Sequence, residues 1–398
     1  MLRPFKPHGG HPRLSSGPAS RDDPIPEIPV SSQQIKKIAI STGGGDAPGL
    51  NAVIRAIVLA ATERGWECHG IRDGYNGLLA PEEFPEGGVI PLSRKSVAGI
   101  THLGGTILGT TNRGNPTKFP VEQPDGSFVE VDRSDELVAR FHEHGFDALI
   151  TIGGDGSLAI GYHLANKGLR VIGVPKTIDN DLDRTFVTFG FDTAVSFATE
   201  CLDRLHTTAT SHRRIMVVEM MGRYAGWIAL HAGISGNADV ILIPEIPYDI
   251  HKVAEVVRER ERTGRLYTIV VVAEGAKPID GAVSVLGKAV GQAEKLGGVG
   301  EKVAHELEHL TGREARTVVL GHLLRGGSPT SFDRLVALRF GAAAVRALDE
   351  GMSSIMVSLS PPTVRYEPLK AAISRMKVVT LDCDTMESAR DLGIKFGD

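Results

Sequence analysis

Three short apolar runs in this chain each end at a turn that is rich in glycine or aspartate. The runs cover residues 37–40, 148–152 and 171–174, and the turns that follow them read GGGDAPGLN, GGDGS and PKTIDND. A segment with apolar residues at helical spacing follows each of the first two turns. A strand, a tight turn and a helix form the repeating unit of doubly wound α/β folds, which bind ligands at the carboxyl ends of their strands.

Strand-like and helix-like segments alternate through the rest of the chain. Apolar runs typical of buried strands cover residues 214–220, 240–243, 266–273 and 315–320. Segments with helical spacing cover residues 193–205, 250–262, 300–310 and 331–348. This alternation predicts an α/β fold with mainly parallel sheets flanked by helices.

The turn at 175–181 places two carboxylates one residue apart, directly after a strand. If the chain stays extended there, Asp179 and Asp181 point to the same side and into one cleft. One carboxylate can then accept a proton while the other helps to hold a divalent metal ion, an arrangement that suits phosphoryl transfer. The structural alternative is a helix N-cap or an Asx turn, where Asp and Asn are favoured.

The glycine-rich turn at 153–157 has the features of an anion site. Its glycines let backbone N–H groups approach a phosphate, and the start of the following helix adds a favourable dipole. Asp155 fits among phosphates if a magnesium ion lies between them, and a purely structural tight turn is the alternative. The turn at 43–51 is not a Walker A loop, because it lacks the Gly-Lys-Ser/Thr ending, and it lacks the Gly-x-Gly-x-x-Gly spacing of dinucleotide folds.

Six motifs, in a fixed order from about residue 36 onward, resemble those of 6-phosphofructokinases. They are GGGDAPGLN, the segment GGTILGTTN at 104–112, GGDGS, PKTIDND, the triplet Met221-Gly222-Arg223, and LGHLLRGGSP at 320–329. The resemblance implies a kinase that phosphorylates the 1-hydroxyl of D-fructose 6-phosphate to give fructose 1,6-bisphosphate in glycolysis, with Mg²⁺ as its cofactor. It also implies two Rossmann-like lobes with the active site in the cleft between them.

In the resembling fold the chain crosses between the lobes, so each lobe is discontinuous. We expect a phosphoryl-donor lobe at 36–190 plus 324–374 and a sugar-phosphate lobe at 191–323 plus 375–398. Residues 1–35 carry seven prolines with Gly and Ser between them, which predicts a flexible extension.

The resemblance assigns catalytic and donor-binding roles to individual residues. Asp179 matches the base that accepts the proton of the 1-hydroxyl, Arg223 the transition-state arginine, and Thr177 a contact to the transferring phosphate or the sugar hydroxyl. Asp155 and Asp181 are the implied magnesium ligands. The implied donor-binding residues are Gly45, Arg113, Gly154, Asp155, Gly156, Ser157 and Lys176.

The implied sugar-phosphate site draws mainly on the second half of the chain. Its residues are Thr177, Asp179, Arg214, Met221, Gly222, Arg223, Glu274, Arg316, His322 and Arg325. Glu274 would accept hydrogen bonds from sugar hydroxyls, while His322 and Arg325 would hold the 6-phosphate. Arg214 and Arg316 match arginines that reach this phosphate from a neighbouring subunit, which implies a homodimer or a homotetramer.

Two positions bear on the phosphoryl donor and indicate different answers. Relatives that use pyrophosphate typically carry Asp where this chain has Gly156, and the missing side chain leaves room for ATP. Lys176 stands where ordinary bacterial ATP-dependent enzymes carry Gly, and lysine there is common in pyrophosphate users as well as in some ATP-dependent branches. We expect ATP, with pyrophosphate as the alternative, because a flexible lysine can swing aside.

Composition is that of a cytoplasmic enzyme without nucleic-acid or membrane partners. The 44 Lys plus Arg and 48 Asp plus Glu give a formal charge of −4, and the three cysteines have no metal-binding spacing. No apolar run approaches the roughly 20 residues of a membrane span.

Two other functions compete with this interpretation. NAD kinases and diacylglycerol kinases share the glycine-acid-glycine turn, so a kinase of another hydroxyl is possible, although such an enzyme would not need the segment 322–329. A catalytically silent regulatory subunit would be expected to lose Asp179 or Arg223, and both are present.

Overall fold

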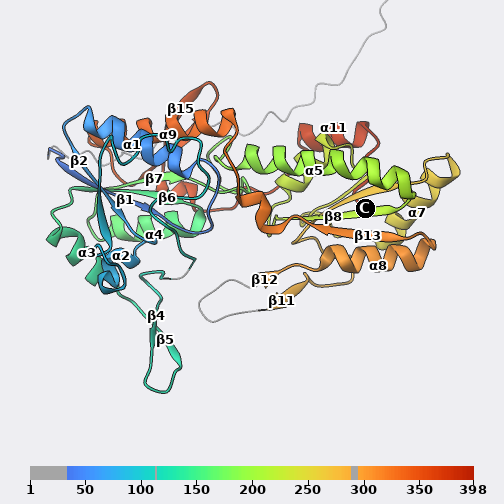
Figure 1. Cartoon of the computed structure of the whole chain (residues 1–398), viewed down its shortest axis with the longest axis horizontal. Coiled ribbons are helices and arrows are strands. Elements are labelled where there is room, and N and C mark those ends of the chain that lie inside the picture. The colour runs from blue at the N-terminus through green and yellow to red at the C-terminus, as the bar shows by residue number, and fades with distance from the viewer. Residues whose placement is uncertain (1–33, 113, 288–294) are drawn as a thin grey trace, which may run out of the picture.

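The computed structural model describes residues 34–112, 114–287 and 295–398. Two β-sheets, each flanked by helices, lie side by side along its longest axis (Figure 1). The predicted N-terminal extension lies almost wholly outside the described residues, and Arg113 lies outside them as well. No helix in the described part combines the length and the apolar character needed to cross a membrane.

The larger sheet has seven strands in the order β15-β14-β7-β6-β1-β2-β3. Its central five strands are parallel, and β3 and β15 pair antiparallel at the two edges. The strands are β1 (Lys37–Thr42), β2 (Glu67–Ile71), β3 (Val89–Leu92), β6 (Ala148–Gly153), β7 (Val171–Pro175), β14 (Ile355–Ser360) and β15 (Thr363–Pro368). The parallel order brings the ends of β1, β6 and β7, and hence the three turns singled out in the sequence, to one edge.

The smaller sheet has four parallel strands in the order β13-β8-β10-β9. They are β8 (Ile215–Met220), β9 (Val240–Leu242), β10 (Thr268–Ala273) and β13 (Ala315–Val319). Two short antiparallel pairs lie outside both sheets, β4 (Phe119–Glu122) with β5 (Phe128–Val131) and β11 (Val285–Gly287) with β12 (Lys295–Leu296).

Helices cover both faces of each sheet. In the larger half α1 (Leu50–Thr62) packs on α9 (Ser331–Asp349) above the sheet in Figure 1, and α4 (Asp155–Asn166) packs below it. In the smaller half α5 (Phe191–His212) and α6 (Trp227–Ser235) cover one face, while α8 (Val299–Thr311), with α7 (Ile250–Arg262) packed against it, covers the other. The remaining helical segments are α2 (Asn76–Leu79), η1 (Pro81–Glu83), α3 (Ser134–Glu143), η2 (Gly321–Arg325), α10 (Leu369–Ala372) and α11 (Asp384–Asp391).

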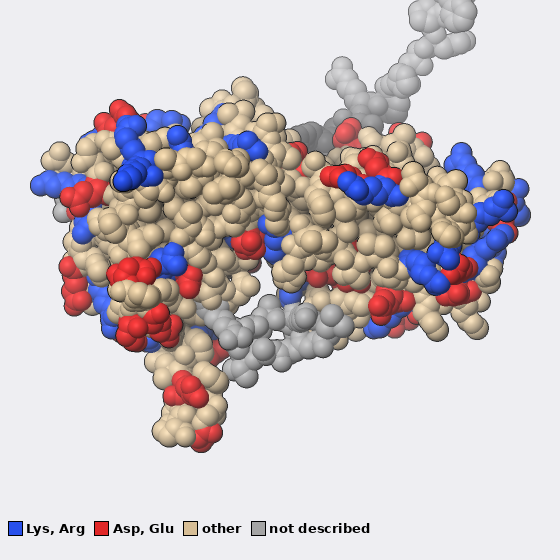
Figure 2. All heavy atoms as spheres, in the orientation of Figure 1, with Lys and Arg blue, Asp and Glu red and all other residues tan. Residues whose placement is uncertain are grey.

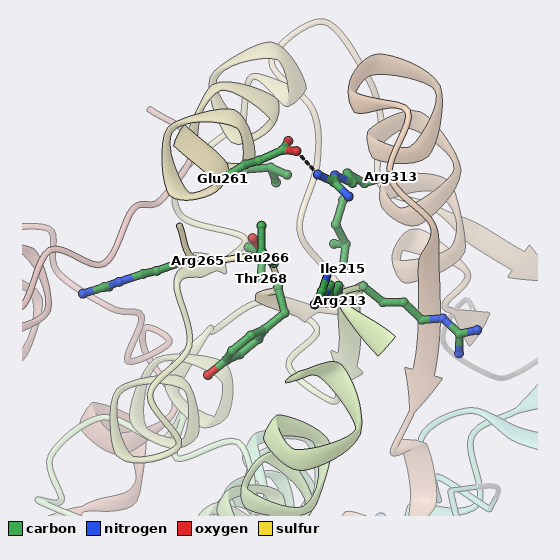
Figure 3. Close-up of a pocket in the computed structure, with 10 residues that line it drawn as sticks. Arg213, Ile215, Glu261, Arg265, Leu266, Thr268 and Arg313 are labelled. Atoms are coloured by element: carbon green, nitrogen blue, oxygen red, sulfur yellow. Dashed lines mark ion pairs between the residues drawn. The ribbon is translucent and has the colours of Figure 1, made fainter. Parts of the chain in front are cut away.

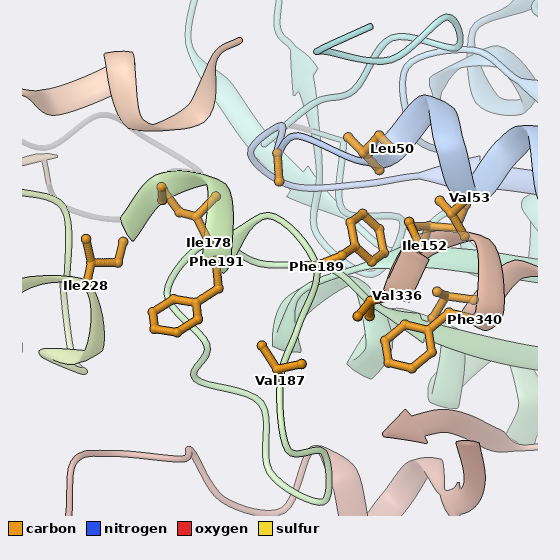
Figure 4. Close-up of a cluster of buried hydrophobic side chains, with 14 of the residues drawn as sticks. Leu50, Val53, Ile152, Ile178, Val187, Phe189, Phe191, Ile228, Val336 and Phe340 are labelled. Atoms are coloured by element: carbon orange, nitrogen blue, oxygen red, sulfur yellow. The ribbon is translucent and has the colours of Figure 1, made fainter. Parts of the chain in front are cut away.

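One hydrophobic core runs without interruption from the larger sheet to the smaller one. Figure 4 shows it where the halves meet: Leu50 and Phe340 lie on the side of the larger sheet, and Ile228 lies on the side of the smaller one. Ile178 and Phe189, from the segment that joins β7 to α5, fill the space between them, and both are fully buried. Packing at the density of a protein interior therefore holds the two halves together through this joining segment.

The observed elements confirm the predicted α/β class with mainly parallel sheets. Helix α7 has the predicted bounds, and α5 extends seven residues beyond its predicted end at 205, to His212. The hairpin β4–β5 was not expected, since both strands are only four residues long and show no clear alternation of apolar and polar residues. The domain boundaries near 190, 323 and 375 stay predictions.

Shortening Phe189 should weaken the whole structure, because its ring is completely buried where the two halves meet. We expect Phe189→Ala to lower the free energy of unfolding by about 3–5 kcal/mol. Leu392→Ala is the control, because this leucine is 70% exposed and its loss should change stability by less than about 0.5 kcal/mol. Urea denaturation followed by circular dichroism measures both, and equal losses in the two variants would contradict this packing.

Candidate active site

The turns at the carboxyl ends of both sheets come together between the two halves. The larger sheet contributes the turns after β1, β6 and β7, and the smaller sheet contributes those after β8, β10 and β13. The space-filling view shows a hollow between the halves, with acidic and basic side chains visible at its rim (Figure 2). The predicted placement of the site in a cleft between the lobes agrees with this view.

The segment after β7 alternates between the core and the cleft. Ile178 and Leu182 are 0% and 1% exposed, and Asn180 between them is also buried, whereas Asp179 and Asp181 are more accessible. The expectation of an extended chain was wrong at one residue, because Asn180 has a φ of 51°. Asn tolerates this left-handed conformation better than most residues, and both aspartates still face away from the core.

Asp179 lies among several charged groups from both halves. Its pKa rises to about 6 because the carboxyl group is desolvated; Glu274 also raises it, whereas Arg325, Arg223 and Lys176 lower it. Its backbone N–H donates to Thr177 Oγ1 at 3.1 Å, and its buried Oδ1 has no hydrogen-bond partner within the described part of the chain. A carboxylate with an unused acceptor atom and a pKa near 6 can take a proton from a bound hydroxyl group.

The second and third aspartates of the predicted site are also close enough to interact. Burial, and then the charges of Asp179 and Asp155, raise the pKa of Asp181 to about 6. Among residues 34–112, 114–287 and 295–398 no group of three or more His, Cys, Asp or Glu residues could hold a metal ion by itself. Mg²⁺ usually takes one or two carboxylates and completes its shell with water and substrate phosphates, so Asp155 and Asp181 fit such an ion.

The first glycine-rich turn is held in place by two cations. Lys176, which is 3% exposed, donates from Nζ to the carbonyl oxygen of Gly43 at 3.0 Å and also to that of Gly45. Burial, and then the neighbouring Arg325 cation, lower the pKa of Lys176 to about 8. Arg325 Nη1 donates to the carbonyl oxygen of Asp46 at 3.2 Å. A Cβ on Gly45 would lie only 2.7 Å from Arg325 Nη1. A side chain at position 45 would therefore push the guanidinium group of Arg325 out of its present place.

The second glycine-rich turn packs directly against the first. Ser157 is buried at the start of α4, and a Cβ on Gly43 would lie 2.6 Å from its hydroxyl oxygen. Gly154 is the extended residue before the helix, and Asp155 and Gly156 are exposed toward solvent. Within the described ranges, every predicted donor-binding residue except Lys176 therefore lies on these two adjoining turns, and Lys176 lies beside them.

The sugar side of the site is formed by three turns of the smaller sheet. Glu274 follows β10, and burial raises the pKa of its carboxyl group. Met221, Gly222 and Arg223 follow β8, and a Cβ on Gly275 would lie 2.0 Å from the carbonyl oxygen of Arg223, so the two turns touch. His322 is exposed in the short helix η2 that follows β13.

Two predicted substrate-binding arginines lie far from this group. Arg214 precedes β8 and Arg316 is the second residue of β13, so both are at the opposite ends of strands that reach the site. A six-residue strand is about 20 Å long. Glu314 pairs with both, at 2.5 Å from Arg214 Nε. Figure 3 shows the pocket that Arg214 lines at this end, where Arg313 pairs with Glu261.

Lys377 lies in the C-terminal part of the chain and contacts residues 175–181, here called the acidic segment. Its Nζ donates to Asn180 Oδ1 at 2.9 Å, and its backbone N–H donates to the Asp181 carbonyl at 2.8 Å. The two partners of the first bond are 197 residues apart, and no motif surrounds the lysine. Only the folded arrangement could reveal it.

This chain is similar to known phosphofructokinases both in a family model and in individual relatives. Residues 37–348 match the family model described as Phosphofructokinase. The chain is 49% identical to "ATP-dependent 6-phosphofructokinase 2" of Clostridium perfringens, over 92% of this chain and 100% of that protein. It is 48% identical to "Pyrophosphate--fructose 6-phosphate 1-phosphotransferase" of Streptomyces coelicolor, over 91% of this chain and 100% of that protein.

Solved structures with similar folds include phosphofructokinases. The T-state phosphofructokinase of Pichia pastoris matches with a TM-score of 0.71 and 30% identity, over 86% of this chain and 36% of that one. A pyrophosphate-dependent phosphofructokinase from Marinobacter aquaeolei matches with a TM-score of 0.74 and covers 90% of this chain and 91% of that one. At 21% identity, the second match concerns the fold alone.

The raised pKa of Asp179 should make the stability of the fold depend on pH. In an unfolded chain an aspartate titrates near 3.9, whereas in the fold this one titrates at about 6, so its contribution to stability falls as pH rises from about 4 to 6. Asn carries no charge to desolvate. We expect Asp179→Asn to be more stable than the parent at pH 8, by up to about 3 kcal/mol, and to lose this advantage near pH 4.

Thermal unfolding of the parent and the variant between pH 4 and pH 8 measures this difference. Asp391→Asn is the matched control, because Asp391 is exposed on the surface at the end of α11. A stability gain in Asp179→Asn that does not change with pH would contradict the buried-charge explanation.

Proposed function

The chain belongs to the phosphofructokinase family, and we propose that it transfers the γ-phosphoryl group of ATP to the 1-hydroxyl of D-fructose 6-phosphate. The reaction yields fructose 1,6-bisphosphate, a step of glycolysis. The observation that carries this proposal is the convergence on Asp179 of Arg223, Glu274, Arg325 and Lys176 from both halves of the molecule.

Asp179 acts as the general base in this proposal. Its free Oδ1 accepts the proton of the 1-hydroxyl as the hydroxyl oxygen attacks the phosphorus atom. A pKa of about 6 lets the carboxylate be ionised near neutral pH and still be basic enough to accept a proton. Thr177, whose Oγ1 accepts the Asp179 N–H, would contact the transferring group from its place beside the base.

Positive groups stabilise the charge that develops on the transferring phosphoryl group. Arg223 and Arg325 act on the Asp179 carboxyl from two different turns of the smaller half, and Lys176 lies beside the glycine turn of the larger half. Phosphoryl transfer is catalysed mainly by positioning and charge neutralisation, which such groups provide. Mg²⁺, held by Asp155 and Asp181, would neutralise charge on the phosphate oxygens of the donor.

Fructose 6-phosphate is proposed to bind on the turns of the smaller sheet. Glu274 accepts hydrogen bonds from the sugar hydroxyls, with Met221 and Gly222 on the adjacent turn. His322 and Arg325 hold the 6-phosphate, for which a guanidinium group offers paired N–H donors. Because Arg325 also contacts the turn at Gly45 and Asp46, it links the sugar-phosphate side to the donor side.

The proposed donor is ATP because space is open at Gly156. A Cβ at this position would meet no atom within 4 Å, and its backbone lies outside the left-handed region, so neither packing nor conformation requires glycine there. The absent side chain is then explained by room for a ligand. Lys176 Nζ donates to the carbonyl groups of Gly43 and Gly45, and no atom of the lysine lies within 4 Å of a Cβ at position 156.

Pyrophosphate is the second candidate donor. The Streptomyces coelicolor and Clostridium perfringens proteins, named for different donors, are almost equally similar to this chain. A buried lysine beside the first glycine turn also suits a small, highly charged donor.

A homodimer or homotetramer with cytoplasmic activity is also part of the proposal. Arg214 and Arg316 cannot reach the site of their own chain, because they lie at the far ends of β8 and β13. Two arginines held together by Glu314 are instead available to the 6-phosphate of a neighbouring subunit.

The direct test measures fructose 1,6-bisphosphate formation from fructose 6-phosphate with ATP or pyrophosphate, each with and without Mg²⁺. We expect turnover with ATP and Mg²⁺, and loss of turnover when the metal is chelated. Asp179→Ala should lower kcat by about 10²–10⁴-fold with little change in sugar-phosphate binding, because only proton transfer is lost.

Gly156→Asp is the control for the donor, since its carboxylate enters the open space and opposes the phosphates of a nucleotide. Turnover with ATP should fall at least tenfold while folding is unchanged. Activity with neither donor in the parent would end the proposed function, and activity with pyrophosphate alone would replace ATP as the donor.

Subunit mixing tests the shared site. Asp179→Ala and Arg316→Ala should each have low activity alone, because the first lacks its base and the second cannot supply the neighbouring arginine. Mixed oligomers should regain activity, because an Arg316→Ala subunit keeps an intact Asp179 and receives Arg316 from its neighbour. Activity that does not exceed the average of the two separate variants would contradict sharing between subunits.

A further inference from the structure

Lys377 connects the acidic segment to the C-terminal part of the chain through its side chain and its backbone. Its Nζ donates to Asn180 Oδ1 at 2.9 Å and to the carbonyl oxygens of Thr185 and Phe186, each at 3.0 Å. An ammonium group has three N–H donors, so these bonds use all of them. The backbone N–H of Lys377 donates to the carbonyl of Asp181 at 2.8 Å.

The ammonium acts on the one residue of the acidic segment that has an unfavourable backbone conformation. Asn180 stands between the proposed base and the proposed metal ligand with a φ of 51°, a conformation that costs most non-glycine residues about 1 kcal/mol and Asn less. Its Oδ1 accepts from Lys377 Nζ and from the backbone N–H of Thr188 at 3.2 Å. These two bonds hold the residue that sets the direction of Asp181 relative to Asp179.

The same lysine contacts the helix that follows the turn carrying Arg223. Its carbonyl oxygen accepts a hydrogen bond from Trp227 Nε1 at 2.9 Å, at the start of α6. Two residues further on, the Val379 N–H donates to Glu245, whose carboxylate also accepts from the backbone N–H of Gly226. The segment around Lys377 thus contacts the acidic segment on one side, and on the other it is linked to the end of the 221–226 turn through Glu245 and Trp227.

We propose that Lys377 is a positioning residue for phosphoryl transfer, which holds Asn180 in its left-handed conformation and so keeps Asp179 in register with Arg223. This inference rests on the proposed function and assigns a role to a residue outside the family motifs quoted above. Lys377 touches no reacting group in this account. Errors of about 1 Å in such a constellation can cost about 100-fold in rate, which gives the expected size of the effect.

The test compares Lys377→Met with the parent enzyme under the conditions in which the parent turns over. Methionine keeps much of the side-chain length and removes the three donors. We expect kcat to fall by about 10–100-fold while the KM for fructose 6-phosphate changes less than about threefold, because the proposed sugar-phosphate residues lie on other turns. A kcat within threefold of the parent would overturn the proposal.

Arg375→Met is the matched control from the same segment. Arg375 pairs with Asp183 at 2.6 Å and is largely exposed, so it lies near the acidic segment without bonding to Asn180. Its loss should leave kcat within about twofold. An equal fall of kcat in both variants would show a general effect of charge and would overturn the specific role of Lys377.

A double-mutant cycle tests whether Lys377 acts on kcat through its hydrogen bond to Asn180. If Lys377 acts through the amide of Asn180, Asn180→Ala lowers kcat to a similar extent, and adding Lys377→Met lowers it little further. Two losses that multiply fully would contradict this path. If Lys377→Met does not fold, Asn180→Ala alone, with the lysine present, must still lower kcat about tenfold at nearly unchanged KM, and a smaller fall would overturn the proposal.

Failure of this inference differs from failure of the proposed function. A parent enzyme that phosphorylates fructose 6-phosphate while Lys377→Met keeps full turnover rejects only the role of the lysine. Calorimetric binding of fructose 6-phosphate and thermal unfolding of each variant exclude loss of the fold as the cause of a low kcat.

Discussion

Burial of two aliphatic side chains controls the geometry of the proposed site. Ile178 and Leu182 are both packed in hydrophobic clusters. Because these two side chains are fixed in the core, the segment cannot rotate, and the aspartates between them stay on the side of the cleft. Fully burying such side chains contributes roughly 1.5–3 kcal/mol each. Asp179 and Asp181 are therefore held in a poorly hydrated position that their charges alone would not favour.

This position accounts for the chemistry. The pKa of both carboxyl groups rises to about 6, mainly because they are desolvated, and two neighbouring acids contribute to the rise at Asp181. The surrounding cations offset part of this cost, and they are the same groups that a transferring phosphate would meet. In the free protein the two carboxylates are poorly solvated, so binding of a proton or a metal ion to them becomes more favourable.

The shared core explains why groups from two sheets act at one place. Ile178 and Phe189 lie between the halves, so the carboxyl ends of both sheets face each other across a short distance. Lys377 adds polar contacts from the end of the chain to the same junction. The two remaining arginines, Arg214 and Arg316, lie at the opposite end of the smaller sheet, and this distance is the reason for proposing that a second subunit supplies them.

Local sequence was sufficient for the elements and for most of the site. Apolar runs and helical spacing predicted α7 and the central strands, and the motif residues Asp155, Asp179 and Asp181 lie together as their turns suggested. These features depend on neighbours within a few residues, or on the rule that parallel strands end at one edge. The positive φ of Asn180, the bonds of Lys176 to the first glycine turn and the role of Lys377 were decided only by the tertiary structure. Each of them depends on hydrogen bonds between residues more than 130 positions apart, or on a backbone conformation that such bonds maintain, and no local pattern encodes those distances.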